Sequence, residues 1–189
     1  MPTEKVQLKT YSILTNDLKL IKDKFAQENF DIEEVNDPEW EDELKEWYWK
    51  EPDSYIFAYI NNEIVGIASF FKRKVKFQEN LIKMAGFGGL TVAIKHRGKG
   101  IAKKLIEERI ELAKDWGADI AFLNTDINKL GNLFSKFGFV PLRRNYVFIG
   151  KSGQKHEDDS GMIAPILSNE KFREVLNHTE PFFIGDSNL

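Results

Sequence analysis

Glycines and cationic side chains alternate in the segment from His96 to Lys104, HRGKGIAKK. The pattern after Gly100 predicts a helix, and the start of a helix carries about half a positive charge, which disfavours cations there by roughly 0.3–1 kcal/mol each. A bound polyanion would offset this cost, because glycines let the backbone come close and free N–H groups point at phosphate oxygens. The segment therefore indicates a phosphate-binding turn. A solvated turn with surface lysines is the structural alternative.

A strand and a helix must position this turn. The short, apolar and partly β-branched run 89–94 predicts the strand. Residues 100–116 place apolar side chains on one broad face and charged ones opposite, which predicts an amphipathic helix that stops at Gly117. Arg109 falls within the apolar face, and the helical pattern gives no reason for it. Glycines at positions 86, 88 and 89 indicate a bulge or a close backbone approach ahead of the turn.

The turn resembles a known signature. Residues 97–102, RGKGIA, fit the Gln/Arg-x-x-Gly-x-Gly/Ala pattern of the GNAT superfamily of acyl-CoA-dependent N-acyltransferases. Residues 133–139, LFSKFGF, resemble the family's second signature, Leu-Tyr-x-x-x-Gly-Phe, at the usual separation. The resemblance covers roughly residues 55–150.

The resemblance implies that acetyl-CoA (coenzyme A) is the cofactor, with its phosphates on the turn. Backbone groups of Leu90 and Val92 would pair with the pantetheine arm and polarise the thioester carbonyl. The cofactor-binding residues expected on this basis are Leu90, Thr91, Val92, Arg97, Gly98, Lys99, Gly100, Ile101, Ala102, Lys103, Asn128 and Phe134.

The chemistry implied by the family is direct attack of an amine on the thioester. A lysine-like amine, with a pKa of about 10.4, is almost wholly protonated at pH 7, so a base or a desolvating site is needed. Many members use the tyrosine of the second signature to protonate the leaving thiolate, but Phe134 stands at that position here. Tyr146 is one substitute, and a core aromatic residue is its structural alternative.

The C-terminal region resembles the aminoglycoside 2'-N-acetyltransferases, through DDSGMIAPI at residues 158–166 and a final Gly185-Asp186. That resemblance implies a pocket for substrate ammonium groups. Gly88 replaces a glutamate that those enzymes place there as a base, so the base is sought at Asp126 or Asp159, which are alternatively a helix-leading Asp and a loop acid. The expected substrate-binding residues are Glu39, Trp40, Gly88, Asp159, Asp186 and the carboxylate of Leu189.

Composition narrows the class of protein. The chain has 189 residues, a formal net charge of −3 and no cysteine, so it has no overall basic field for nucleic acid, no disulfide and no thiolate metal site. The three histidines lack metal-ligand spacing, so no metal is expected. No signal peptide or apolar stretch of membrane-spanning length is found, which predicts a cytoplasmic protein without a membrane partner. We expect a single domain over residues 1–189, and a homodimer is left open.

The remaining patterns predict an α/β fold: a mixed, mostly antiparallel sheet of six or seven strands with helices on both faces. The acidic and aromatic run 31–51 predicts a helix from Pro38, either packed by its tryptophans or forming one wall of a site for a cationic substrate. Helices are also predicted from Asn16 or Asp17 to Phe30, at 128–137 and at 169–176, and strands at 6–14, 55–60, 64–71, 118–124 and 162–167. A closing hairpin is predicted from strands 139–142 and 145–149, followed by a polar loop over 151–160.

These patterns lead to one principal function. We expect an N-acetyltransferase that moves an acetyl group from acetyl-CoA to a primary amine of a small, polycationic acceptor, such as an aminoglycoside-like compound or a polyamine. An acyl-CoA-binding module without turnover is the first alternative, because Phe134 and Gly88 replace expected residues. A protein or peptide N-acetyltransferase is the second.

Overall fold

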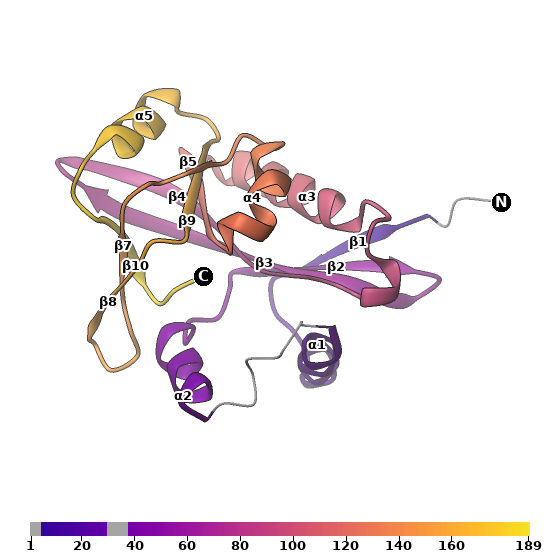
Figure 1. Ribbon diagram of the computed structural model, residues 1–189. Coiled ribbons are helices and arrows are strands. Elements are labelled where there is room, and N and C mark those ends of the chain that lie inside the picture. The colour runs from indigo at the N-terminus through magenta and orange to yellow at the C-terminus, as the bar shows by residue number, and fades with distance from the viewer. Residues whose placement is uncertain (1–4, 30–37) are drawn as a thin grey trace.

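The computed structural model describes residues 5–29 and 38–189 (Figure 1). A long hairpin of two strands, β3 and β4, runs through the middle of the molecule. The helices are α1 (Asn16–Asn29), α2 (Pro38–Trp47), α3 (Ile101–Trp116), α4 (Ile127–Ser135) and α5 (Asn169–Asn177), with a short 3-10 helix η1 (Ile94–His96). The strands are β1 (Gln7–Tyr11), β2 (Ser54–Ile60), β3 (Glu63–Phe77), β4 (Asn80–Val92), β5 (Ile120–Asn124), β6 (Val140–Pro141), β7 (Tyr146–Ile149), β8 (Lys155–Asp158), β9 (Gly161–Pro165) and β10 (Phe182–Asp186).

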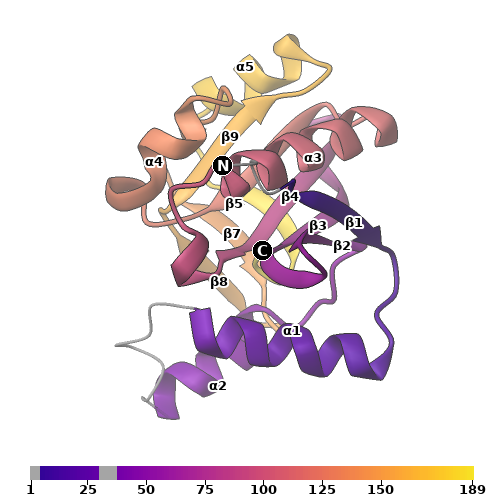
Figure 2. The same cartoon turned by 90° about the vertical axis from the view of Figure 1, so that its right-hand side faces the viewer.

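The main sheet has seven strands in the order β1-β2-β3-β4-β5-β9-β6. Among these strands only the β4–β5 pair is parallel, and α3 makes the crossover between its two members. Helices α1 and α2 lie on one face of the sheet, whereas α3 and α4 lie on the other (Figures 1 and 2). The structure confirms the predicted α/β fold with a mixed, mostly antiparallel sheet.

The predicted hairpin of residues 139–142 and 145–149 is wrong. β6 pairs with β9 in the main sheet, whereas β7 belongs to a second sheet of three strands in the order β10-β7-β8. β8 lies in the segment predicted to be a polar loop. Its alternate residues His156 and Asp158 are half-buried, and His156 stacks on Phe148. β10 was not predicted either.

β3 continues well beyond Phe71, where the predicted strand ended. Its second half buries Arg73, Val75 and Phe77 and exposes the lysines between them, so the strand alternates with period two despite its charge. At the other end of the hairpin, β4 stops at Val92 rather than Ile94, and η1 leads into the glycine turn.

One predicted helix terminus is confirmed, and at another the cap lies one residue earlier than predicted. Gly117 ends α3 in a left-handed conformation, with φ of 75° and its N–H bonded to the carbonyl oxygens of Ala113 and Lys114, which confirms the predicted stop. α1 begins at Asn16, but Thr15 caps it, because the Thr15 hydroxyl accepts the N–H of Leu18 at 3.3 Å.

Candidate functional site

The glycine turn presents open backbone at the start of α3. Gly98 and Gly100 have φ of 78° and 77°, and nothing lies within 4 Å of where a Cβ would sit on either residue. Gly100 caps the helix without a side-chain hydrogen bond, and the first turn holds no acidic residue. The first N–H groups of α3 therefore have no side-chain acceptor at this end, an arrangement that suits phosphate.

Cations surround this open turn. Lys99 and Lys103 are both exposed. The ammonium group of Lys99 lies 3.4 Å from Nδ1 of His96, and that of Lys103 lies 3.7 Å from a carboxylate oxygen of Glu107. Arg97 is tied instead to the protein, because its guanidinium donates to the carbonyl oxygens of Val92 at 3.3 Å and Asn29 at 2.8 Å. Thus Arg97 joins the turn to the end of α1, and the lysines supply charge around the turn.

β4 is bulged just before it reaches the turn. Gly88 pairs with Ser69 and Thr91 with Ile67, so β4 has two residues between these pairs where β3 has one. Gly89, one of the extra residues, has φ of 54°, which glycine adopts with little strain. The structure confirms the predicted irregularity of this strand.

β4 and β5 separate at the bulge. Their parallel pairing covers three residues and ends at Gly86, opposite Phe122. Beyond this point a pocket of about 640 Å³ opens, lined by the β4 bulge, the end of β5, α1, the end of α2 and the last residues of the chain. Its walls include the aromatic residues Tyr48, Trp49, Tyr55 and Phe134.

Arg109 lies at this pocket and is almost wholly buried, with 1% of its surface exposed. Its Nη1 donates to the carbonyl oxygen of Gly88 at 3.3 Å, and its guanidinium carbon lies 4.7 Å from the centre of the Phe87 ring. Nε and Nη2 have no hydrogen-bond partner. Burial lowers the pKa of Arg109 to about 9, so the side chain is still a cation at neutral pH.

A hydroxyl group also reaches the pocket. Tyr48 OH accepts one hydrogen bond from Nδ2 of Asn124 at 3.2 Å and another from Nδ2 of Asn188 at 3.3 Å. Both neighbours are donors here, so the hydroxyl proton of Tyr48 stays available for a further acceptor. Burial raises the pKa of Tyr48, which keeps this hydroxyl protonated at neutral pH.

The structure distributes the expected cofactor residues between the pocket and the glycine turn. Leu90, Thr91 and Phe134 line the pocket, and Phe134 packs edge-on against Phe139 with ring centres 5.9 Å apart. Val92 lies beyond the pocket, toward the turn, and Ile101 and Ala102 begin α3 on the other side of that turn. Asn128 is exposed in the first turn of α4 and does not line the pocket.

Asp126 lines the pocket but serves as the cap of α4. Its carboxylate accepts the backbone N–H groups of Asn128 at 3.1 Å and Lys129 at 3.2 Å. The bond from the Lys129 backbone is the largest cause that lowers the pKa of Asp126. α4 therefore begins at Ile127 rather than Asn128, and the bonds of Asp126 fit the helix-leading alternative better than a free base.

The other expected catalytic residues are not brought to the pocket. Tyr146 is fully buried among Phe122 and Phe148, and its hydroxyl donates to Oδ1 of Asn188 at 3.2 Å. This placement fits the core-aromatic alternative. Asp159 is exposed in the loop between β8 and β9 and does not line the pocket.

Some of the expected substrate-binding residues line the pocket, and others do not. Gly88 and Leu189 line the pocket, and a Cβ at Gly88 would lie 2.8 Å from the main-chain carbonyl carbon of Leu189. The space that a glutamate would use at position 88 is thus filled by Leu189. Asp186 lies outside the pocket and pairs with Lys50 at 2.9 Å. Glu39 and Trp40 lie in the first turn of α2, where their side chains fall outside the described residues.

Two further observations concern ligands and membranes. Within residues 5–29 and 38–189, no three His, Asp or Glu side chains gather in a way that would hold a metal ion. None of the helices in the same part of the chain combines the length and the apolar character needed to cross a membrane.

Comparison with known proteins identifies the class to which this fold and site belong. The model of the family described as "Acetyltransferase (GNAT) domain" matches residues 18–141. The chain therefore belongs to the GNAT acetyltransferase family, as the two signatures predicted. Enzymes of this family use acetyl-CoA.

Individual relatives are more distant. GCN5-related N-acetyltransferase 4, chloroplastic, of Arabidopsis thaliana is 35% identical over 79 residues, which are 41% of this chain and 27% of that protein. The aligned part of the chain thus spans about a quarter of the relative's length.

Two solved structures illustrate the shared fold. The GNAT family N-acetyltransferase YhbS of Escherichia coli, in complex with CoA, has a TM-score of 0.62 at 17% identity, and the match covers 98% of this chain and 91% of YhbS. The NatC complex bound to Gag peptide and CoA has a TM-score of 0.54 at 18% identity, with 85% and 98% covered. At these identities the likeness concerns the fold alone.

Proposed function

We propose that this protein transfers the acetyl group of acetyl-CoA to the primary amine of a small acceptor. The open turn at Gly98 and Gly100 carries the proposal, because bare backbone and an uncapped helix start follow directly on the strand that borders the pocket. Membership of the GNAT family supports the same donor. A tight turn without a ligand would gain nothing from cations gathered at the positive end of α3.

The two ends of the site perform different tasks. The turn holds the phosphates of CoA through the first N–H groups of α3 and the ammonium groups of Lys99 and Lys103. Acetyl-CoA supplies an acetyl group that is activated as a thioester. Residues 89–91 of the bulge orient this group at the pocket wall, because β5 no longer pairs with β4 there.

Tyr48 is the residue we assign to proton transfer. Its hydroxyl accepts two N–H groups and keeps its own proton free, so it can protonate the leaving sulfur. Phe134 cannot perform this task, because its side chain has no hydroxyl group. The aromatic walls make the surroundings of the acceptor amine less polar than water, which favours the neutral, nucleophilic form of that amine.

The pocket suits an acceptor with one cationic centre. The carboxylates of Asp23 and Glu51 lie in the lining and attract an ammonium group, whereas the rings of Tyr55 and Trp49 already have Lys22 and Lys50 over them. A polycationic acceptor stays a prediction that gains no support here, since Asp159 and Asp186 lie outside the pocket. A peptide amine is the second acceptor class to test, because the fold is shared with a peptide-bound acetyltransferase complex.

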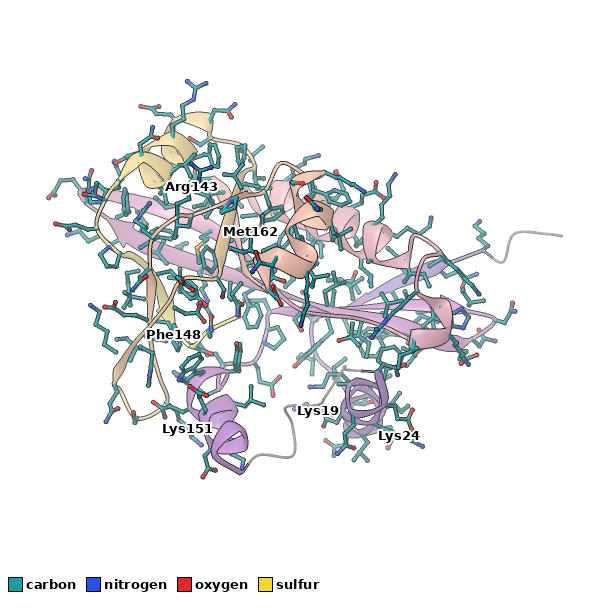
Figure 3. All side chains as sticks on the ribbon, viewed as in Figure 1. Lys19, Lys24, Arg143, Phe148, Lys151 and Met162 are labelled. Atoms are coloured by element: carbon teal, nitrogen blue, oxygen red, sulfur yellow. The ribbon has the colours of Figure 1, made fainter. Side chains whose placement is uncertain are left out.

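Titration calorimetry with CoA tests the donor site. Replacing both Lys99 and Lys103 by Glu should weaken CoA binding about 10-fold or more, because two attractive charges become repulsive beside phosphates. The matched control is the pair Lys19→Glu and Lys24→Glu on α1 (Figure 3), which reverses the same number of exposed charges outside the pocket. Equal affinity in both double variants would refute the turn as the CoA site.

An acceptor panel then tests the reaction. The wild-type protein is incubated with acetyl-CoA and small monoamines, polyamines, aminoglycosides or peptides, and released thiol and acetylated product are measured together. The proposal predicts both products with small monoamines. Tight CoA binding without transfer to any member of the panel would favour the binding module.

A further inference from the structure

Arg109 is a buried cation whose charge nothing in the described structure balances. The residue lies on α3, two of its three guanidinium nitrogens have no hydrogen-bond partner, and its one bond goes to a neutral carbonyl. Leaving such a group buried is costly, because an unpaired N–H loses its bonds to water and a buried charge loses its hydration. A side chain kept in this state calls for a ligand that compensates it.

The other charged side chains of the pocket have partners within the protein. Lys22 pairs with Asp23 at 3.0 Å and Lys50 with Asp186 at 2.9 Å. Asp126 caps α4 and pairs with Lys129 at 3.4 Å, while Glu51 accepts the hydroxyl of Tyr55. Among the cationic side chains of the described residues that line the pocket, Arg109 is thus the one without a carboxylate partner.

We propose that Arg109 is the fixed cation of the transfer site, where it stabilises the negative charge that develops on the sulfur of CoA. The inference rests on the proposed function. Three observations support the sulfur of CoA as the group that Arg109 stabilises. Arg109 binds the carbonyl of Gly88 at the start of the bulge, it shares the pocket with Phe134, and it has no carboxylate partner in the described structure.

The reaction creates the charge that Arg109 is placed to stabilise. The acceptor nitrogen bonds the acetyl carbon, the carbon–sulfur bond breaks with its electron pair on sulfur, and one proton leaves the nitrogen. The guanidinium needs no direct bond to sulfur, because a charge in a weakly polarisable pocket acts over several ångströms. Tyr48 then supplies the proton that converts the thiolate to the thiol, and the proton released by the nitrogen restores the Tyr48 hydroxyl, so that the amide and the thiol leave a neutral tyrosine behind.

Packing against Phe87 does not account for the arginine by itself. A desolvated cation over an aromatic ring is stabilised by about as much as one unsatisfied buried donor costs, and Arg109 has two guanidinium nitrogens without a partner. A methionine at this position could make the same contacts with Phe87 without a charge to bury. The cation is therefore explained by a bound negative charge and not by the core.

The test measures the ionisation of the CoA thiol in its complex with the protein. Thiolate formation is followed by ultraviolet absorbance as pH is raised, and the same titration with desulfo-CoA subtracts the tyrosines of the protein. We expect the thiol pKa to be lower in the wild-type complex than in free CoA. Arg109→Met should raise the pKa of the bound thiol by about 1 to 2, as expected for one charge lost a few ångströms away.

Two further variants separate charge from structure. Arg109→Lys keeps a cation, so the thiol pKa should stay closer to the wild-type value than in Arg109→Met. Arg143→Met removes a charge from an exposed loop outside the pocket (Figure 3) and should leave the thiol pKa unchanged. If Arg109→Met fails to fold, the Arg109→Lys and wild-type complexes still report the sulfur environment.

The outcomes distinguish this inference from the proposed function. Equal thiol pKa values in the wild-type and Arg109→Met complexes would overturn the role of Arg109 and leave the acetyltransferase proposal standing. A wild-type thiol pKa no lower than that of free CoA would do the same. Failure of the wild-type protein to bind CoA would overturn both.

Discussion

Arg73 and Arg109 are both buried, yet their surroundings differ. Arg73, on β3, donates from Nη1 to the carbonyl oxygens of Ile184 at 2.9 Å and Ser187 at 2.8 Å, and from Nη2 to that of Asn188 at 3.0 Å. Arg109 makes one longer bond, at 3.3 Å. Burial lowers the pKa of Arg73 to about 10, although nearby carboxylates oppose the change, and that of Arg109 to about 9 with no such opposition.

The difference separates a structural arginine from one held for a ligand. The carbonyls bound by Arg73 belong to the last strand and the residues after it, so Arg73 fixes the segment that places Leu189 against Gly86 and Gly88. The protein thus supplies all the partners of Arg73. Arg109 is more deeply buried than Arg73, but its guanidinium borders the pocket and lacks equivalent partners.

The largest effect should follow from replacing the structural arginine. Arg73→Met leaves three buried carbonyls without their donor, so we expect a loss of about 3–5 kcal/mol in the free energy of unfolding. The melting temperature should fall by on the order of 10 °C. Differential scanning calorimetry measures this fall, and Lys72→Met, an exposed neighbour on the same strand, is the control. A melting temperature within about 2 °C of wild type would contradict the structural role.

Features of the fold that depend on neighbouring residues could be predicted from the sequence. The glycine turn, the stop at Gly117 and the bulge near Gly89 follow from neighbouring residues, and the structure has all three. The short apolar runs of the predicted strands were enough to predict the mixed sheet. The second sheet was missed, because β10 and β8 become strands only through pairing with β7.

The pocket was harder to predict because its groups come from distant parts of the chain. Tyr48 is oriented by asparagines that lie 76 and 140 positions away, and no spacing rule connects them. Arg109 did leave a signal, since it interrupts the apolar face of its helix. That signal could not identify Gly88 and Phe87 as its neighbours, which requires the packing of α3 on β4.

The second prediction concerns Arg109→Met, which should not lower the free energy of unfolding as Arg73→Met does. Without CoA, Arg109→Met should leave the free energy of unfolding unchanged or raise it by about 1–3 kcal/mol, because an apolar side chain of similar length replaces a buried charge that lacks partners. Urea unfolding of the protein without ligand measures the change. A loss comparable to that of Arg73→Met would show that Arg109 supports the fold, and the contrast between the two arginines would collapse.

The smallest expected effect is a pH dependence of the stability difference between the Arg109→Met variant and the wild-type protein. The pKa of Arg109 is about 9 in the folded protein, well below its ordinary value, so above pH 9 the unfolded chain holds a proton that the folded protein has released. Stability contributed by this residue therefore rises with pH there, by up to about 1.4 kcal/mol per pH unit, and is flat below pH 8. The stability advantage of Arg109→Met should shrink between pH 9 and pH 10. An advantage that stays constant across urea titrations at pH 7, 8, 9 and 10 would mean that Arg109 is not a strained, buried cation.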